Sequence, residues 1–237
     1  MKPRFISDIH LSKDSPHLTD AFKAFLNESK ESCTHLFILG DLFEIWIGDD
    51  DDNSFNQDIK KILIDFTSDG PETFLIHGNR DFLIGEVFAQ ETGITLLPDP
   101  YTLDINNQKV VVSHGDFLCT DDEGYMKFRN EVRTEQWQSN FMQKDLDERK
   151  QIAAALRADS KAATSIKSNA ITDVNPASVD VFVEEYKPDL FIHGHTHRPD
   201  VHDMGSCKRV VLGDWGSYGW FLTIAGQDFN LEKFSIS

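Results

Sequence analysis

The chain has 237 residues, of which 40% are hydrophobic and 27% are charged, a composition ordinary for one compact domain with a sizeable core. Its 23 basic and 40 acidic side chains give a net charge of −17, which argues against loose binding to nucleic acid or to anionic lipid. A substrate that carries phosphate would therefore need bound cations to reverse the local charge.

The three cysteines, Cys33, Cys119 and Cys207, are far apart and form no CxxC motif. This spacing argues against a disulfide framework or a thiolate zinc site and favours a reducing, cytoplasmic compartment. The first residues reach Asp8 after only a few apolar positions, so no signal-peptide core is expected. No later run approaches the roughly 18 apolar residues of a membrane span, which leaves contact with a membrane surface open.

Alternating strands and helices are predicted along most of the chain. Short apolar runs predict core strands at residues 5–6, 36–39, 74–76, 110–112, 190–192, 210–212 and 221–224. Apolar side chains at helical spacing predict helices over residues 18–26, 55–66 and 179–186. Ser15-Pro16 and Asn175-Pro176 supply caps and first-turn prolines for the first and third helices. This alternation indicates an α/β sandwich.

Residues 122–172 interrupt the alternation, because they contain helix-prone stretches and no β-like run. We predict that they form a helical cap inserted into a single domain that spans residues 1–237. The acidic run at residues 49–52 is expected to be a solvated loop.

Five successive predicted strands end in potential metal ligands, usually beside glycine. These are Asp8 and His10, Asp41, Asn79, His114, and His195 with His197. Sites in α/β folds assemble at the carboxyl ends of strands. In an extended chain, residues two apart face the same way, so Asp8 with His10, and His195 with His197, are expected to form ligand pairs.

Carboxylate, imidazole and amide donors without thiolate suit divalent ions such as Mn²⁺, Fe²⁺, Zn²⁺ or Mg²⁺. Seven ligands exceed the needs of one tetrahedral ion and predict two ions about 3.5–4 Å apart that drive water onto phosphorus. Asp41 is our choice for the bridging carboxylate. One such histidine alone would more often be a core or surface residue, and His17, His35, His77, His193 and His202 are interpreted in that way.

These blocks resemble, in order and content, the signature of the calcineurin-like metallophosphoesterase family. The resemblance rests on Asp8-x-His10, Gly40-Asp41-x-x-Glu44, Gly78-Asn79-Arg80-Asp81, His114 and Gly194-His195-x-His197. It implies an α/β sandwich of two mixed β-sheets flanked by helices. It also implies that Asp8, His10, Asp41 and His197 surround one ion and that Asp41, Asn79, His114 and His195 surround the other.

Arg80 departs from the commonest family pattern, in which a histidine after the asparagine donates a proton to the leaving group. Arginine stays protonated and is a poor general acid, but its planar fork recognises phosphate well. The substitution therefore favours a leaving group that needs no proton, such as a phosphomonoester released from a pyrophosphate. Asp81 is expected either to orient Arg80 or to be a surface turn carboxylate.

The stretch at residues 40–50, the Gly-Asn-Arg-Asp block and the long insertion resemble the branch of this family that hydrolyses UDP-2,3-diacylglucosamine to UMP and 2,3-diacylglucosamine 1-phosphate in lipid A biosynthesis. The resemblance implies Mn²⁺ as the metal, a nucleotide-linked glycolipid as the substrate, and a peripheral position on the cytoplasmic face of the inner membrane. It also implies substrate binding by Asp122, Ser160, Thr164 and Lys167, whose other interpretation is an ordinary solvated helix face.

Residues 149–170 hold five basic residues against one acidic residue, which predicts an anion-attracting patch in an acidic chain. Two acyl chains would also need an apolar chamber. The candidates to line it, which are equally candidates for ordinary core packing, are Phe82, Tyr125, Met126, Phe128, Trp137, Phe141, Met142, Ile152 and Leu156.

In the expected mechanism, Asn79, Arg80 and His195 stabilise the charge that builds on the phosphoryl oxygens while a metal-activated hydroxide attacks. A broader phosphodiesterase or phosphomonoesterase on the same scaffold is the alternative enzyme. Nuclease action is disfavoured by the net charge of −17 and by Arg80. A catalytically silent binding scaffold is the alternative from another class, although such proteins normally lose metal ligands.

Overall fold

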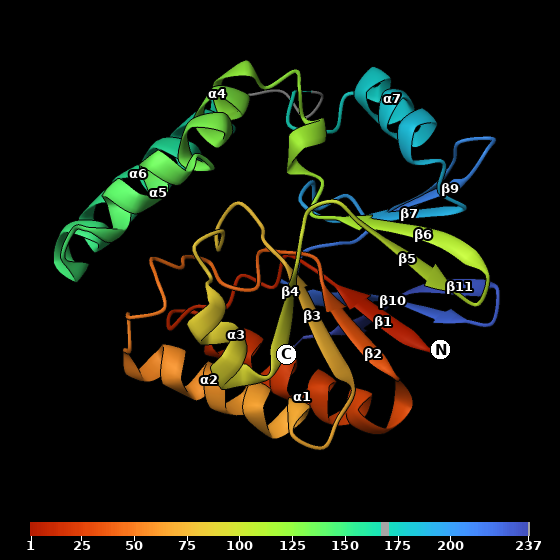
Figure 1. Ribbon diagram of the computed structural model, residues 1–237, viewed down its shortest axis with the longest axis horizontal. Helices are drawn as coiled ribbons and strands as arrows, with labels where there is room; N and C mark the ends of the chain where they lie inside the picture. Colours follow the sequence, from red (N-terminus) through yellow and green to blue (C-terminus); the bar gives the residue numbers. More distant parts are fainter. Residues whose placement is uncertain (167–170, 237) are drawn as a thin grey trace.

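The computed structural model describes residues 1–166 and 171–236, and the side chains of residues 161–166 lie outside that description. It contains two mixed β-sheets, as predicted (Figure 1). The first has the order β11 (Asp228–Ser235), β10 (Tyr218–Ala225), β1 (Pro3–Ile6), β2 (His35–Ile38), β3 (Glu72–Ile76) and β4 (Ile94–Leu97). The second has the order β5 (Tyr101–Ile105), β6 (Gln108–Ser113), β7 (Leu190–His193), β9 (Lys208–Val211) and β8 (Asp200–Asp203).

The central strands of each sheet run parallel. Strands β1 to β4 pair in parallel, and so do β6, β7 and β9. The pairs β10 with β11, β5 with β6, and β8 with β9 are antiparallel. Parallel pairing brings the carboxyl ends of neighbouring strands to one edge of their sheet, where α/β proteins build their sites.

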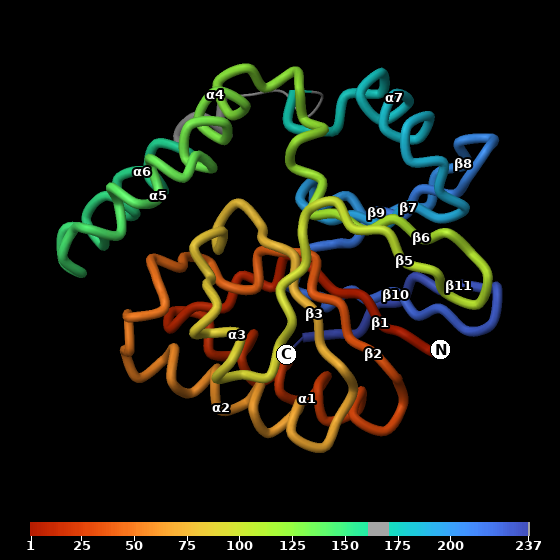
Figure 2. Tube along the Cα trace, in the orientation of Figure 1, coloured from red at the N-terminus to blue at the C-terminus, as the bar shows by residue number. Residues whose placement is uncertain are grey.

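Apolar side chains fill the space between the two sheets. Phe5, Phe37, Val110, Ile192 and Val210 are buried there, and they belong to strands of both sheets. Because strand side chains alternate between faces, each sheet also needs a cover on its outer side. The trace in Figure 2 shows that α1 to α3 cover the first sheet and α7 covers the second.

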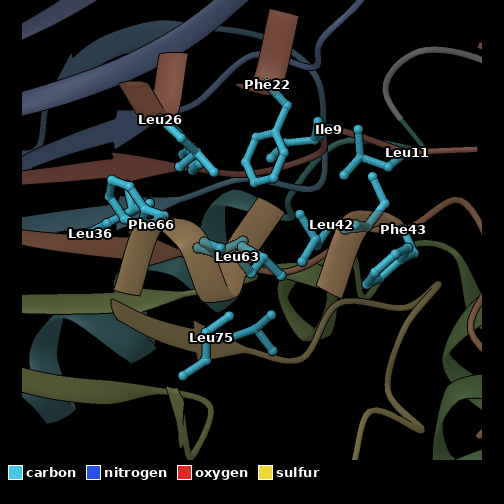
Figure 3. Close-up of a cluster of buried hydrophobic side chains, with 14 of the residues drawn as sticks. Ile9, Leu11, Phe22, Leu26, Leu36, Leu42, Phe43, Leu63, Phe66 and Leu75 are labelled. Atoms are coloured by element: carbon cyan, nitrogen blue, oxygen red, sulfur yellow. The ribbon is translucent and has the colours of Figure 1, made fainter. Parts of the chain in front are cut away.

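The helices that cover the sheets carry the predicted apolar faces. Helices α1 (Pro16–Ser32), α2 (Ser54–Thr67) and α3 (Glu86–Thr92) bury side chains such as Phe22, Leu26, Leu63 and Phe66 against Leu36 (Figure 3). Helix α7 (Pro176–Tyr186) packs on the second sheet in the same manner. The apolar face of α7 is therefore buried against the second sheet.

The cap signals are borne out for one helix and only in part for another. The side chain of Asn175 accepts a hydrogen bond from the Ser178 backbone N–H, and Pro176 opens α7. Pro16 likewise opens α1, but the side chain of Ser15 makes no capping hydrogen bond. The fixed backbone of proline is thus the stronger start signal for α1.

The predicted strands and helices are found, and within the described ranges four further strands and one α-helix were missed. The missed strands are β4, β5, β8 and β11, and the missed helix is α3. All four of these strands lie at sheet edges, where many side chains are exposed or half-buried and no long apolar run marks the strand.

The cap helices are α4 (Glu123–Val132), α5 (Glu135–Met142) and α6 (Leu146–Ile166), which follow a short 3-10 helix, η1 (Asp116–Leu118). Figure 1 shows them as a layer that extends away from both sheets. The guanidinium of Arg149 donates to the Ile47 carbonyl oxygen at 2.8 Å, and Arg133 donates to the Gly78 carbonyl oxygen at 2.9 Å. The cap is therefore anchored to the loops that follow β2 and β3. The boundaries of the cap insertion, residues 122–172, stay a prediction.

Candidate metal centre

The seven predicted ligands lie in the loops that follow five parallel strands. Asp8 and His10 follow β1, Asp41 follows β2, Asn79 follows β3, His114 follows β6, and His195 and His197 follow β7. The first sheet supplies four of these side chains and the second supplies three. The centre therefore lies where the carboxyl edges of the two sheets adjoin.

The backbone at five of these residues is left-handed, and four of them belong to the two pairs that we predicted to be extended. The φ angles are 55° at Asp8, 55° at His10, 53° at Asp41, 67° at His195 and 56° at His197. Residues other than glycine adopt this conformation rarely and at an energetic cost, and such strain clusters at functional sites. The ligand pairs thus converge through tight loops, and the prediction of alternation along an extended chain is wrong.

Three of the side chains meet on one side of the centre. The Nε2 atoms of His10 and His197 are 3.3 Å apart, and His197 Nε2 is 3.3 Å from Asp8 Oδ1. His10 Nε2 also lies 3.9 Å from Asp41 Oδ2. Asp8, His10 and His197 offer ligand atoms that all lie within 4.8 Å of one another, close enough to bind one ion.

A second group lies beside the first. His114 Nε2 is 3.0 Å from Asn79 Oδ1 and 3.8 Å from Asp41 Oδ1, and His195 Nδ1 is 2.9 Å from the same Asn79 oxygen. Asp8, Asp41 and His114 form a further set whose ligand atoms lie within 4.8 Å. Asp41 thus places one carboxylate oxygen near each group, and its role as a bridge stays a prediction.

Buried carboxylates control the electrostatics of this cluster. Burial alone would lower the pKa of His114, yet the charges of Asp41 and Asp8 raise it to about 9. Burial would raise the pKa of Asp8, but hydrogen bonding to His197 and the charge of His197 hold it well below its usual range. Burial, aided by the charge of His114, lowers the pKa of His195 to about 4. The carboxylates therefore create a strongly negative field, and the donor set fits divalent cations.

Neighbouring groups fix the orientation of the ligands. His114 Nδ1 lies 2.8 Å from the Leu39 carbonyl oxygen, which favours the tautomer with a free Nε2. Asp8 Oδ2 accepts hydrogen bonds from Ser7 Oγ at 2.5 Å and from the His195 backbone N–H at 3.0 Å. Metal-binding side chains are commonly held by such outer hydrogen bonds, which also raise their affinity.

Asp81 has a role that differs from both interpretations made from the sequence. It is fully buried and accepts hydrogen bonds from the backbone N–H groups of Gly78 at 2.8 Å and Leu42 at 2.7 Å. Burial and then the charge of Asp41 raise the pKa of Asp81 to about 6. Asp81 therefore ties together the loops that carry Asp41 and Asn79, instead of orienting Arg80 or lying on the surface.

Two residues next to the centre were not assigned a role there from the sequence. Glu44 Oε2 lies 3.1 Å from His10 Nδ1, where it orients the ring. The ring of Tyr125 stacks on His195 with 5.5 Å between centroids, and its hydroxyl donates to Asp116 at 2.7 Å. Glu44 belongs to the block Gly40-Asp41-x-x-Glu44, which was the signal that could have identified it. Tyr125 was predicted only as a candidate to line an apolar chamber.

A cavity of about 520 Å³ separates the cap helices from the body. Asn79 and Arg80 line it at the metal centre, and Asp122 and Ser160 line it farther into the cap. Its apolar lining contains six of the residues predicted for a lipid chamber, namely Phe82, Tyr125, Phe128, Trp137, Phe141 and Leu156. The Thr164 side chain and the whole of Lys167 lie outside the described residues.

The three basic residues of α6 whose side chains are described pair with carboxylates of the body, while Lys161 and Lys167 lie outside the described side chains. Arg149 pairs with Asp50, Lys150 with Asp51 at 3.2 Å, and Arg157 with Glu44. These pairs also show that the acidic run is more than a solvated loop, because Asp52 pairs with Lys60 and Asp49 accepts hydrogen bonds from Gly85 and Phe88. The basic patch and the acidic loop were predicted separately, but Arg149 and Lys150 of the former pair with Asp50 and Asp51 of the latter.

Comparison with known proteins places the chain in a family. The model of the calcineurin-like phosphoesterase family matches residues 1–199. The chain is 45% identical to a UDP-2,3-diacylglucosamine hydrolase of Enterobacter sp. (strain 638) and 44% identical to one of Klebsiella pneumoniae, in each case over 99% of both chains. A further enzyme of this name, from Escherichia coli O81, is 43% identical over 99% of both chains.

Solved structures support the fold. A novel archaeal phosphodiesterase matches with a TM-score of 0.51 and 12% identity, over 99% of this chain and 100% of that one. Within the described residues, no helix combines the length and apolar character that crossing a membrane demands. The chain belongs to the calcineurin-like phosphoesterase family and, within it, to the branch formed by the UDP-2,3-diacylglucosamine hydrolases.

Proposed function

We propose that the protein hydrolyses UDP-2,3-diacylglucosamine to UMP and 2,3-diacylglucosamine 1-phosphate in lipid A biosynthesis, with two divalent cations, Mn²⁺ in the first instance. The observation that carries this proposal is the convergence of seven side chains suited to binding metal beside an apolar cavity. The identity of 43–45% to enzymes of that name over nearly the whole chain supports the same substrate.

The metal ligands are assigned to two sites. Asp8, His10, Asp41 and His197 would hold one ion, and Asp41, Asn79, His114 and His195 would hold the other. The contacts support this division, because His10 lies against His197, His114 lies against Asn79, and Asp41 has one oxygen near His10 and the other near His114. When bound, such ions activate water and neutralise charge on phosphoryl oxygens.

Protein groups beside the ions position the substrate. The backbone N–H of Arg80 donates to Asp41 Oδ1 at 2.8 Å, so the arginine is fixed directly next to the proposed bridge. Its side chain reaches the cavity and can hold a phosphate through its planar fork. Asn79 and His195 complete the polar wall and stabilise charge that develops on phosphorus oxygens.

The nature of the leaving group explains why a proton donor is not needed at position 80. Arg80 cannot donate a proton at neutral pH. A pyrophosphate releases a phosphate that is stable as an anion, whereas an alkoxide needs protonation. The chemistry of Arg80 therefore supports a phosphoric anhydride over a simple phosphate ester.

The cavity under the cap supports a lipid substrate. Phe82, Trp137 and Phe141 form an aromatic cluster in its wall, with ring centroids 4.9–6.1 Å apart between neighbours. Burial of each acyl CH₂ against such a wall is worth about 0.8 kcal/mol. Asp122 and Ser160 line the same cavity and are proposed to bind the sugar or its amide groups.

Contact with the cytoplasmic face of the inner membrane is part of the proposal. Ile45 lines the cavity and Met142 lies at the end of α5, and both side chains are exposed. Exposed apolar side chains near the cavity would let the enzyme rest on the bilayer that holds its substrate.

A comparison of substrates tests the function. Release of product from UDP-2,3-diacylglucosamine, 4-nitrophenyl phosphate esters and DNA would be measured side by side with and without Mn²⁺. We expect the lipid pyrophosphate to be hydrolysed far faster than the others, and Asp41→Ala to abolish the activity. His17→Ala, at an exposed position of α1, is the matched control and should keep it.

Other outcomes of this experiment point to the alternatives. Comparable rates on the simple esters would indicate a broader phosphodiesterase or phosphomonoesterase. Purified protein that binds no Mn²⁺ and hydrolyses none of the substrates would indicate a silent scaffold and refute the proposal.

A further inference from the structure

A second cavity, of about 550 Å³, lies between the start of α7, the loop after β7, and strands β8 and β9. Thr196 and Arg198 line it at the end nearest the metal ligands, and Arg209 lines it from β9. None of the functions assigned above uses this cavity. Figure 1 shows the cap helices and α7 on opposite sides of the short segment that follows β6. The cap helices line the first cavity and α7 lines the second.

Two buried donors in the second cavity lack acceptors among the described residues. Arg209 is only 9% exposed, and its Nε makes no hydrogen bond, although Nη1 lies 3.0 Å from His193 Nε2. Thr196 is 8% exposed, and its Oγ1 makes no hydrogen bond. Buried polar groups are almost always satisfied, because leaving them unpaired costs the desolvation of the group. Both groups therefore point to a ligand that supplies acceptors.

The rest of the lining shows what kind of ligand fits. Asp173 and Asp200 border the same cavity, and Asp173 is 3.0 Å from the Arg198 guanidinium. Carboxylates would oppose a second multiply charged anion at this place, and buried donors would oppose a purely apolar group. Val179 and Val211 add an apolar surface. The cavity thus combines donors, acceptors and an apolar wall.

A pyrimidine nucleoside has the complementary chemistry. Uracil presents two carbonyl acceptors and one N–H donor on a flat ring, and ribose adds hydroxyls that can donate to carboxylates. The donors of Arg209 and Thr196 match the carbonyl oxygens, and Asp173 and Asp200 match the N–H and the hydroxyls. Bases that present amino groups in place of a carbonyl would leave the buried donors unpaired, which is an effective way to reject them.

The second cavity is lined by residues next to the proposed ligands in the chain. Thr196 stands between the proposed ligands His195 and His197 in the chain, and His193, the partner of Arg209, lies two residues before His195. The cap cavity adjoins the same centre through Asn79. A substrate whose pyrophosphate lies at the centre can therefore extend one end into each cavity.

We infer that the second cavity binds the uridine half of the substrate, while the cap cavity holds the diacylated sugar. This inference rests on the proposed function, because it assigns the ends of that substrate. It makes Arg209 and Thr196 specificity-determining residues for the base, distinct from the residues that contact phosphorus.

Photo-crosslinking with 4-thiouridine 5′-monophosphate tests the placement, because the reactive sulfur replaces a base carbonyl oxygen. The wild-type protein would be irradiated with Mn²⁺ present, and the modified peptides would be mapped by mass spectrometry, with excess UMP as competitor. We expect UMP-sensitive crosslinks within residues 172–180 and 196–211. Crosslinks confined to the cap helices, or none that UMP suppresses, would overturn the inference.

Inhibition by nucleotides tests the assigned residues. Thr196→Val keeps the side-chain shape and removes one donor, which should weaken inhibition by UMP about 3- to 10-fold and reduce the preference for UMP over CMP. Arg209→Lys should act in the same direction. The matched control is Thr223→Val, a change of equal shape at a 9% exposed threonine of β10, and it should leave UMP inhibition unchanged.

The outcomes separate this inference from the proposed function. Unchanged UMP inhibition in folded Thr196→Val and Arg209→Lys variants would refute the assignment while hydrolysis of UDP-2,3-diacylglucosamine by the wild type continued. Failure of the wild type to release UMP would refute the proposed function itself, and crosslinking, which needs no turnover, would still report where the nucleotide binds.

Discussion

Arg149→Met should loosen the cap without unfolding the body. The Arg149 side chain lies almost wholly buried, where its Nη1 donates to the Ile47 carbonyl oxygen at 2.8 Å and to Asp50 Oδ1 at 2.8 Å. Methionine retains much of the apolar stem and removes the guanidinium. The Ile47 carbonyl oxygen then loses a hydrogen bond from a charged donor.

The size of the effect follows from these contacts. A hydrogen bond to a charged group contributes about 1.5–3 kcal/mol. The Asp50 side chain is 56% exposed, so its ion pair adds only about 0–1 kcal/mol after screening by solvent. We expect the opening free energy of α6 to fall by about 2–3 kcal/mol, and the Michaelis constant for a lipid substrate to rise.

Amide hydrogen exchange of residues 146–160 measures this opening, and denaturant unfolding monitors the whole protein. Lys150→Met is the matched control, because the Lys150 side chain is 50% exposed and pairs with Asp51 at 3.2 Å, which predicts a change of about 0–1 kcal/mol. Equal exchange protection of α6 in wild type and Arg149→Met would refute the anchoring role.

Acid should weaken the same anchor. The hydrogen bond from Arg149 is the largest influence on Asp50 and holds the pKa of Asp50 below its usual range. The stabilising contribution is therefore present above the unfolded pKa of an aspartate, about 3.9, and is lost as the pH falls through the lower folded value. Exchange protection of α6 should decline over this acid range in the wild type and decline less in Arg149→Met. An identical acid dependence in both proteins would contradict the pairing.

Three further substitutions test the centre. His114→Ala should lose tightly bound Mn²⁺ and turnover while keeping a folded body, and near-normal rates at saturating Mn²⁺ would refute its assignment as a ligand. Arg80→Ala should keep both metal ions, measured by elemental analysis, yet lose about 10²- to 10³-fold in turnover, so that unchanged kinetics would exclude a role in phosphate binding. Asp81→Asn should destabilise the protein by about 2–4 kcal/mol and weaken metal binding, because the amide cannot accept from both the Gly78 and Leu42 N–H groups; equal Mn²⁺ affinity and stability would show that these bonds do not position the ligands.

The ligands could be found from the sequence because each follows an apolar run that marks a core strand. Asp41 and His114 are typical, since burial on both faces makes their strands continuous in hydrophobicity. The backbone conformation of the loops that carry these ligands could not be predicted. The left-handed backbone at Asp8 and His10 depends on hydrogen bonds to the neighbouring loop, such as Asp8 N–H to the Gly40 carbonyl oxygen at 3.0 Å.

Contacts between distant segments account for the other differences. Asp81 accepts one hydrogen bond from Gly78 and another from Leu42, which lies 39 positions earlier, and this distant partner could not be read from the residues around Asp81. The basic residues of α6 were counted as a patch, but Arg149 meets Asp50 across 99 positions of sequence. Local composition reports the charge of a segment and not the carboxylates that the fold brings against it.

Hydrolysis of UDP-2,3-diacylglucosamine in ¹⁸O-labelled water tests the central claim most directly, because mass analysis of both products shows which bond is broken and where water enters. The account predicts Mn²⁺-dependent formation of UMP and 2,3-diacylglucosamine 1-phosphate, with one labelled oxygen per turnover, carried by UMP. Absence of these products with saturating Mn²⁺, or cleavage that places no water oxygen on either phosphorus, would contradict a metal-dependent pyrophosphate hydrolase.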